Sequence, residues 1–262
     1  SETWISALAT ERTRARTMAA YTSALSAGLA LGPLTLSLLG TEGALPYHLG
    51  AGLAALAGLF IASPKVRAPH FGEAALHSPL RFLGRAPVSM GALLLTAALE
   101  TAALSFLALY AMGFGWSTEG ATGLVSAMMI GAIALQMPIG WLGDHMDRRR
   151  LLTALALLSG LGAALWPLAI GHAGATYGLF FVWGGTLMGM QTIVIALIGS
   201  RFRGGELVGI FAATGLAWGI GSLFGPSAVG LAMQVSSQGF ALVAAVACAA
   251  FAFVAWRMKS PA

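Results

Sequence analysis

One carboxylate lies in the middle of a long apolar run. The run covers residues 88–112, and Glu100 lies about 12 residues into it. At about 1.5 Å of rise per helical residue this is about 18 Å, near the middle of a bilayer about 30 Å thick. An ionised group there costs about 2.5–3.5 kcal/mol on insertion scales. Glu100 should therefore face water or a polar partner, or stay protonated, and it could exchange a proton or bind a polar ligand.

Thr96 lies one helical turn before Glu100 and gives that carboxylate a second interpretation. In the functional interpretation Glu100 is a proton or substrate site, the usual role of an ionisable residue inside a membrane. In the structural interpretation Thr96 forms a hydrogen bond with Glu100, and both side chains only stabilise the helix. We favour the functional interpretation and place Thr96 in the same site.

Three further side chains within apolar runs could contact a ligand. Gln136 and Gln191 have amides that donate and accept hydrogen bonds, either with a substrate or with a neighbouring helix. Trp218 could form an aromatic wall of a cavity, as could Trp183, although packing is the commoner role of buried tryptophan. These alternatives remain open, and Gln136, Gln191 and Trp218 are candidate binding residues.

The stretch GWLGDHMDRRRLL, residues 140–152, places two aspartates and three consecutive arginines between two apolar runs. Arginines at the end of a membrane helix set its orientation, whereas acidic residues contribute little to orientation. The arginines could be topological anchors alone, but that would leave Asp144 unexplained. We expect Asp144 to form a charge network between helices with Arg148, Arg149 and Arg150.

The composition indicates which elements position these residues. Of 262 residues, 58 % are hydrophobic and 9 % are charged, and the mean hydropathy is +0.83, which is unlike a soluble domain. A helix needs about 20 apolar residues to cross a bilayer. We count eight such runs, at 17–39, 46–63, 88–112, 120–142, 151–171, 175–200, 207–233 and 237–256. The sequence therefore predicts an all-α, polytopic membrane protein.

The basic residues predict its orientation. All 14 Lys and Arg residues fall at alternate ends of the eight runs, in groups at 12–16, 65–85, 148–150, 201–203 and 257–259. The connections between these groups contain no basic residue, and basic loops face the cytoplasm. We expect a multi-pass protein of a cell inner (plasma) membrane with a cytoplasmic C-terminus.

The sequence lacks the residues that several classes of function require. Cys248 is the only cysteine, so the chain can form neither a disulfide framework nor a cysteine metal site. No phosphate-binding glycine-rich loop and no hydrolase spacing occurs. The net charge of +5 is spread over loops instead of forming a nucleic-acid-binding patch. We expect no enzyme activity, no cofactor, no metal and no nucleic-acid partner.

The arginine-rich stretch resembles a family signature. GWLGDHMDRRR is similar to the cytoplasmic loop motif of the major facilitator superfamily, Gly-x-x-x-Asp-(Arg/Lys)-x-Gly-Arg-(Arg/Lys)-(Arg/Lys). The matching residues are Gly140, Asp144, Arg148, Arg149 and Arg150, whereas His145 and Asp147 depart from the motif. In that superfamily the loop latches the outward-open state, so the resemblance implies a cytoplasmic gate at the five matching residues.

The resemblance covers essentially the whole chain. ETWISALATERTRARTMAAYTSALSAGLALGP is similar to the end of helix 4, the basic loop and helix 5 of that superfamily. The eight runs would then be helices 5–12 of twelve. Residues 1–63 would hold the end of helix 4 and helices 5–6, residues 64–88 the cytoplasmic central loop, and residues 89–262 the C-terminal six-helix half. We expect an N-terminally incomplete chain that lacks about 100 to 120 residues.

Two apolar runs share a glycine-proline pattern. SAGLALGP (26–33) and GIGSLFGP (219–226) match at an offset of 193 residues, as a repeated six-helix half would. Small residues allow helices to approach closely, and proline bends a helix. The expected packing residues are Gly28, Gly32, Pro33, Gly221, Gly225 and Pro226.

The resemblance implies a secondary active transporter of a small solute that works by alternating access. We expect proton coupling, because Glu100 is not accompanied by a second buried carboxylate. The expected partners are membrane lipid, a small-molecule substrate and protons, and the expected state is a monomer. The alternative is an eight-helix membrane protein that does not transport, such as a scaffold or an intramembrane enzyme.

Overall fold

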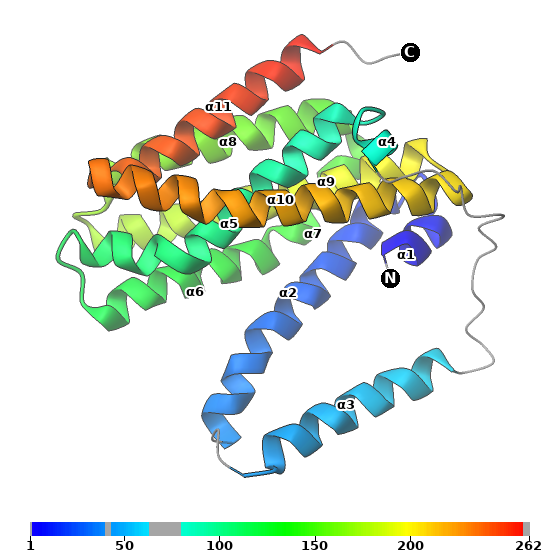
Figure 1. The fold of residues 1–262 in the computed structure, drawn as a ribbon, viewed down its shortest axis with the longest axis horizontal. Coiled ribbons are helices and arrows are strands. Elements are labelled where there is room, and N and C mark those ends of the chain that lie inside the picture. The colour runs from blue at the N-terminus through cyan, green and yellow to red at the C-terminus, as the bar shows by residue number, and fades with distance from the viewer. Residues whose placement is uncertain (1, 40–42, 63–79, 259–262) are drawn as a thin grey trace.

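The computed structural model of the chain describes residues 2–39, 43–62 and 80–258, without the side chains of residues 29, 30, 32–39, 80 and 81. Over these residues the chain is helical and contains no strand (Figure 1). Its helices are α1 (Glu2–Leu8), α2 (Arg14–Leu39), α3 (Leu45–Ile61), α4 (Leu80–Leu83), α5 (Pro87–Met112), α6 (Thr118–Ala134), α7 (Gln136–His145), α8 (Arg148–Ala169), α9 (Ala173–Arg201), α10 (Gly205–Val235) and α11 (Gly239–Arg257). The predicted fold class is confirmed at the level of an all-helical membrane protein.

Six helical segments of the described chain are long and apolar enough to cross a membrane. They are α5, α6 together with α7, α8, α9, α10 and α11, and they contain most of each of the last six predicted runs. Helix α2 contains the run predicted at 17–39, and α3 contains residues 46–61 of the run predicted at 46–63; neither helix is in this set. The count of eight spans stays a prediction. The central loop predicted at residues 64–88 also stays a prediction, because residues 64–79 lie outside the described part of the chain.

Short polar side chains and prolines begin several helices. Asp147 accepts a hydrogen bond from the amide of Arg150 at 2.8 Å and caps α8. Ser117 does the same for α6 through the amide of Gly120, and Pro87 is the first residue of α5. These caps satisfy amides that the helix itself cannot pair. Asp147, one of the departures from the family motif, therefore has a structural role in the cap.

Small residues let the helices of the bundle pack closely. A Cβ atom added at Gly221 or Gly225 in α10 would collide with the backbone of Leu94 or Ala98 in α5. The predicted packing role thus has a physical basis at these two glycines, and Pro226 lies beside them inside α10. Cys248 is buried and sits against Gly160 of α8, where it fills space in the core.

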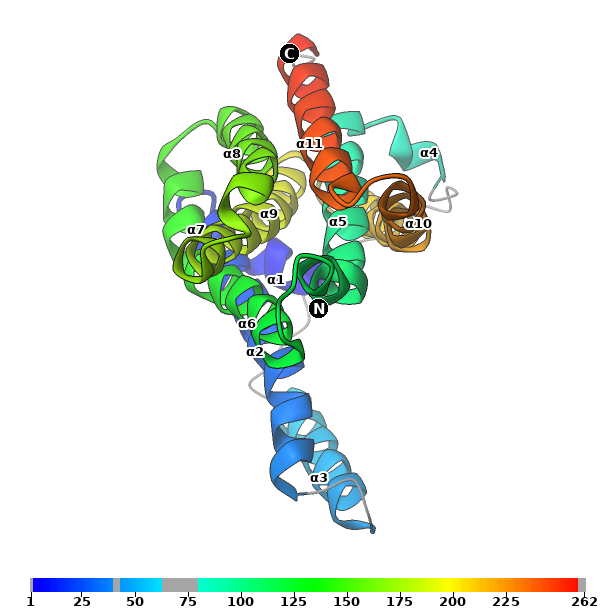
Figure 2. The same ribbon diagram turned by 90° about the vertical axis from the view of Figure 1, so that its left-hand side faces the viewer.

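The first helices stand partly away from this bundle. In Figures 1 and 2, α2 contacts the bundle near its N-terminus and then diverges, and α3 lies apart. A Cβ atom added at Gly28 would meet no described atom within 4 Å. The surroundings of Gly32 and Pro33 lie outside the described part of the structure, so their predicted packing role stays a prediction.

The described arginines gather at one end of the bundle, which we call the basic face. It comprises the starts of α2, α5 and α8 and the ends of α9 and α11. Arg16 in α2 pairs with Asp144 beside the start of α8, and Arg149 in α8 bonds the carbonyl oxygen of Ala255 in α11. Arg85 and Arg201 line one pocket with Arg149. The alternation of charge along the sequence therefore corresponds to one physical face.

Candidate functional site

Asp144 lies at the centre of a charge network on the basic face. Its side chain is 0 % exposed. Its Oδ1 atom accepts from the amide of Ala15 at 2.8 Å, and its Oδ2 atom accepts from the amide and the Nε of Arg16 at 3.2 and 2.9 Å. Ala15 and Arg16 are the second and third residues of α2. The carboxylate therefore caps α2 from another helix, and the positive end of the α2 dipole stabilises its charge.

Arg148 extends the network toward the loop between α1 and α2. Its Nη1 atom is 2.9 Å from Glu11 Oε1, its Nη2 atom donates to the Glu11 carbonyl oxygen, and its Nε donates to the Gly143 carbonyl oxygen. The distance from Arg148 Nη2 to Asp144 Oδ1 is 3.8 Å. Two carboxylates and two arginines thus join α7 and α8 to the N-terminal segment.

Two glycines of α7 bring the network together. A Cβ atom added at Gly140 would lie 2.5 Å from Ala19 Cβ and 2.9 Å from the Ala15 carbonyl oxygen. An atom added at Gly143 would collide with Ile193 and Ala15. Because no side chain separates α7 from the first turns of α2, Asp144 reaches the backbone amides of α2.

The three consecutive arginines do not act as one group. Arg148 belongs to the Asp144 network, whereas Arg149 donates to the carbonyl oxygen of Ala255 at 3.0 Å. The guanidinium of Arg150 forms no hydrogen bond or ion pair with any described residue. Successive helical residues point about 100° apart, so this separation was readable from the sequence. Of the five residues predicted to form a gate, Gly140, Asp144 and Arg148 take part in these contacts, together with Arg16 and Glu11.

Glu100 has a different environment near the middle of α5. It is half-buried, and Thr96 and Ala103, one turn before and after it, are buried. Within the described part of the chain its carboxylate forms no hydrogen bond or ion pair. Thr96 donates instead to the Ala92 carbonyl oxygen at 2.7 Å, so the proposed Thr96–Glu100 bond is not formed. The next residue, Thr101, donates to Ser222 of α10 at 3.1 Å, so its hydroxyl also bonds a group other than Glu100.

Gln136 joins three helices instead of pointing at an open cavity. It is 1 % exposed, and its Oε1 accepts from Thr192 of α9 and, at 3.4 Å, from Thr22 of α2. The hydroxyls of Thr22 and Thr192 are 3.0 Å apart. These contacts satisfy the packing interpretation of Gln136. Nothing local in the sequence pairs these three residues, which are 56 to 170 positions apart in the chain.

Gln191 and Trp218 are half-buried, and neither is joined to Glu100 by a hydrogen bond within the described residues. Trp183 is buried in an aromatic cluster with Trp166 and Phe180, with ring centroids 4.9 and 6.3 Å from its own. Trp183 is therefore a packing residue. Glu100, Gln191 and Trp218 stay candidates for a binding site.

Comparison with known proteins identifies the class. Residues 90–262 match the sequence profile of the Major Facilitator Superfamily. The chain is 27 % identical over 254 residues to a Bacillus subtilis (strain 168) protein named Uncharacterized MFS-type transporter YfkF, covering 89 % of this chain and 61 % of the relative. It is 27 % identical over 242 residues to Uncharacterized MFS-type transporter Ent638_1421 of Enterobacter sp. (strain 638), covering 91 % and 62 %. The chain belongs to the Major Facilitator Superfamily.

This family membership confirms the resemblance inferred from residues 140–150, and both relatives are named as MFS-type transporters. The chain spans about three fifths of the length of the two relatives. The charge network lies partly outside the matched range, because Glu11, Ala15 and Arg16 precede residue 90.

Proposed function

We propose that this chain forms part of a secondary active transporter that moves a small solute by alternating access, with protons as the coupling ion. The carrying observation is the Asp144 network, which joins the N-terminal segment to the six-span bundle at the basic face. Family membership supports the transport activity. The proposal places the protein in a plasma (inner) membrane as a monomer, with the basic face and the C-terminus in the cytoplasm, because arginine-rich loops stay on that side.

The Asp144 network acts as the latch of the outward-facing state. Hydrogen bonds to a charged group contribute about 1.5–3 kcal/mol each, and Asp144 accepts three such bonds. Separating α2 from α7 breaks them together and exposes the carboxylate and both arginines to water, which offsets most of the loss. The network therefore has two favourable arrangements, closed and hydrated, as a switch requires.

Glu100 is the proposed proton site. A half-buried carboxyl group without a partner is neutral when lipid and protein seal it, and it ionises when water reaches it. Opening of the cavity to one side would then release a proton to that side. Gln191 and Trp218 are proposed to contact the substrate, since both are half-buried in the same bundle.

The full-length protein in liposomes tests this proposal. A panel of radiolabelled amino acids, sugars and organic cations is offered with an imposed pH gradient, and a trapped pH dye reports proton movement. We expect one class of solute to accumulate together with proton flux in the wild type. Glu100→Gln should retain solute exchange without proton flux. Undiminished proton flux in Glu100→Gln would exclude the coupling role, and no movement of any solute class would count against transport.

A further inference from the structure

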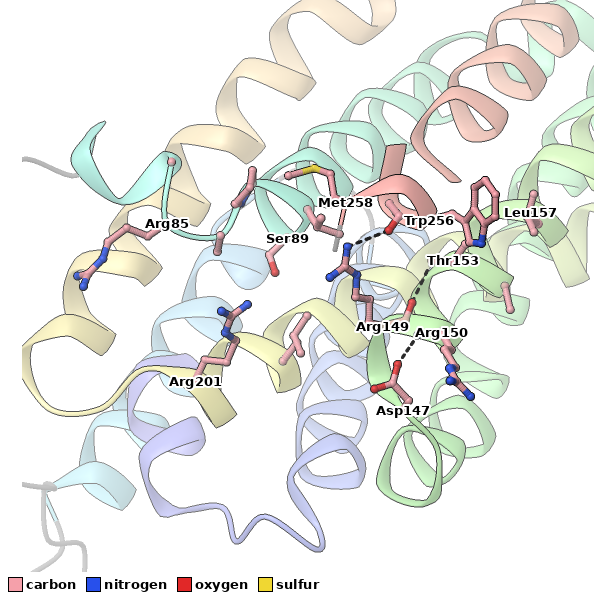
Figure 3. Close-up of a pocket in the computed structure, with 17 residues that line it drawn as sticks. Arg85, Ser89, Asp147, Arg149, Arg150, Thr153, Leu157, Arg201, Trp256 and Met258 are labelled. Atoms are coloured by element: carbon pink, nitrogen blue, oxygen red, sulfur yellow. Dashed lines mark hydrogen bonds between the residues drawn. The ribbon is translucent and has the colours of Figure 1, made fainter. Parts of the chain in front are cut away.

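A second group of arginines surrounds a pocket on the basic face, away from Asp144. The pocket has a volume of about 1280 Å³ and lies between the starts of α5 and α8 and the ends of α9 and α11 (Figure 3). The described residues that line it include Arg85, Arg149, Arg150 and Arg201 and one acidic residue, Asp147. Four positive charges thus face one negative charge.

The charge of this pocket is only partly compensated. Arg85 Nη1 is 2.7 Å from Glu206 Oε1, which neutralises that arginine. Asp147 uses one carboxylate oxygen to cap α8. Arg201 forms no hydrogen bond or ion pair with any residue in the described ranges. The pocket therefore keeps a net positive charge of two even when Glu206 is counted, and it is suited to an anion.

Three polar side chains converge on the middle of the pocket. In Figure 3 the guanidinium groups of Arg149 and Arg201 approach the space beneath Ser89, and the Ser89 hydroxyl points into that space. Ser89 is 3 % exposed but has no hydrogen-bond partner among the residues described. The Ser89 hydroxyl oxygen is not among the fully buried unpaired atoms of the described residues, so it is reachable from the pocket and its donor is available for a ligand. Arg149 is held in place by its bond to the Ala255 carbonyl oxygen.

The wall of the same pocket on the bilayer side is apolar. Leu157 of α8 and Trp256 of α11 both line it, and they are 49 % and 73 % exposed. Leu157 lies within the first three turns of α8. Trp256 is next to the last residue of α11, and tryptophan is common where a membrane helix reaches the interface. A ligand here would place its anionic part among the arginines and an apolar part along α8 and α11.

We propose that this pocket binds the head group of an anionic phospholipid. Arg149 and Arg201 bind the phosphate oxygens, Ser89 donates to the same group, and the acyl chains lie against Leu157 and Trp256. Guanidinium forks match phosphate geometry, and basic pockets between membrane helices take anionic head groups. A free phosphate would use the arginines but leave the apolar wall unoccupied. The site is separate from Asp144 and Glu100 and does not depend on the proposed transport.

Lipid retention by the full-length protein provides the test. The protein is placed in nanodiscs of phosphatidylcholine containing one fifth phosphatidylglycerol, released, and examined by native mass spectrometry. We expect the wild type to retain phosphatidylglycerol above its share in the disc. Arg149→Gln combined with Arg201→Gln should lower this retention by about tenfold or more, because each of the two arginines strengthens the binding of an anionic lipid. Ser89→Ala should lower it about twofold, as expected for one neutral donor.

A matched double variant controls for charge alone. Arg12 and Arg203 are exposed and do not line the pocket, so Arg12→Gln with Arg203→Gln should keep wild-type retention. Equal losses in both double variants, or no loss in the pocket variant, would overturn the site. Inorganic phosphate at millimolar concentration should not displace the lipid, and complete displacement would reassign the pocket to a free anion. Circular dichroism and gel filtration confirm folding, and Ser89→Ala remains informative if an arginine variant misfolds.

Discussion

Two carboxylates of this chain have opposite surroundings. Asp144 is fully shielded and accepts three hydrogen bonds, two of them from the backbone of α2. Glu100 is half-buried, and no described residue bonds its carboxylate. A shielded charge with all its partners fixes two elements in one geometry. A charge without partners is free to bind a ligand or a proton, so the pair suggests a division between latch and coupling site.

The same contrast separates the neighbouring arginines. Arg148 is neutralised by Glu11 and Asp144, whereas Arg149 and Arg201 face a pocket that retains positive charge. Our two proposals therefore assign one loop two functions on its two sides. In them the side facing α2 closes the protein, and the side facing α11 attracts an anionic ligand from the membrane.

Among variants of the basic face, Asp144→Asn should give the largest increase in the labelling rate of a cysteine placed in α2. Removing one partner of a buried charged pair costs about 3–5 kcal/mol, so the latched state should lose at least about a hundredfold in population. Met18 is buried in α2 beside this network. Labelling of Met18→Cys by a membrane-impermeant maleimide, in full-length protein without other cysteines, should become about a hundredfold faster.

Asp147→Asn is the matched control for that variant. It makes the same chemical change three residues further on, at an exposed cap where asparagine functions as well as aspartate. Its labelling rate should equal that of the wild type. If Asp147→Asn and Asp144→Asn accelerated labelling equally, net charge and not the contact with α2 would explain the effect.

Gly140→Ala should give an intermediate effect. Its new methyl group would overlap Ala19 and the Ala15 carbonyl oxygen, and overpacking of this kind costs about 1–3 kcal/mol. We expect labelling of Met18→Cys about tenfold faster than in the wild type. Gly28→Ala, whose methyl group meets no described atom, should change nothing. Unchanged labelling in Gly140→Ala would show that α2 and α7 are not held closely in the membrane.

Glu11→Gln should give the smallest effect. The Glu11 side chain is 58 % exposed, so its ion pairs with Arg148 and Arg14 are screened by water. Exposed pairs contribute about 0.2–1 kcal/mol, and labelling should accelerate less than about fivefold. Maleimide labelling at several salt concentrations measures this. An effect as large as that of Asp144→Asn would mean that Glu11, and not Asp144, carries the latch.

The features that could be predicted from the sequence are those that depend on neighbouring residues alone. Each of the last six spans is a long apolar run without a basic residue, and its length indicates a membrane helix. The motif around Asp144 predicted that this residue meets a base. The sequence could not show that this base is Arg16, 128 residues away, or that backbone amides supply the other bonds. Such partners depend on the packing of α2 on α7, which no local pattern specifies.

Gln136 shows the same limit at the middle of the bundle. Its residue type allowed both a ligand contact and a helix contact, and only the meeting of α2, α7 and α9 places Thr22 and Thr192 beside it. The roles of Arg149 and Arg150 are different, because the angle between successive helical residues separates them from Arg148. Applying that periodicity to the arginine triplet would have predicted two groups.

The most direct test of the division between latch and coupling site compares Glu100→Gln with Asp144→Asn in one preparation of the full-length protein. Labelling of Met18→Cys and solute-driven proton flux are measured for each variant. Glu100→Gln should abolish proton flux and leave the labelling rate unchanged, whereas Asp144→Asn should accelerate labelling and keep the number of protons moved per solute. If both variants changed both quantities together, or if Glu100→Gln retained its proton flux, the two carboxylates would not have separate roles.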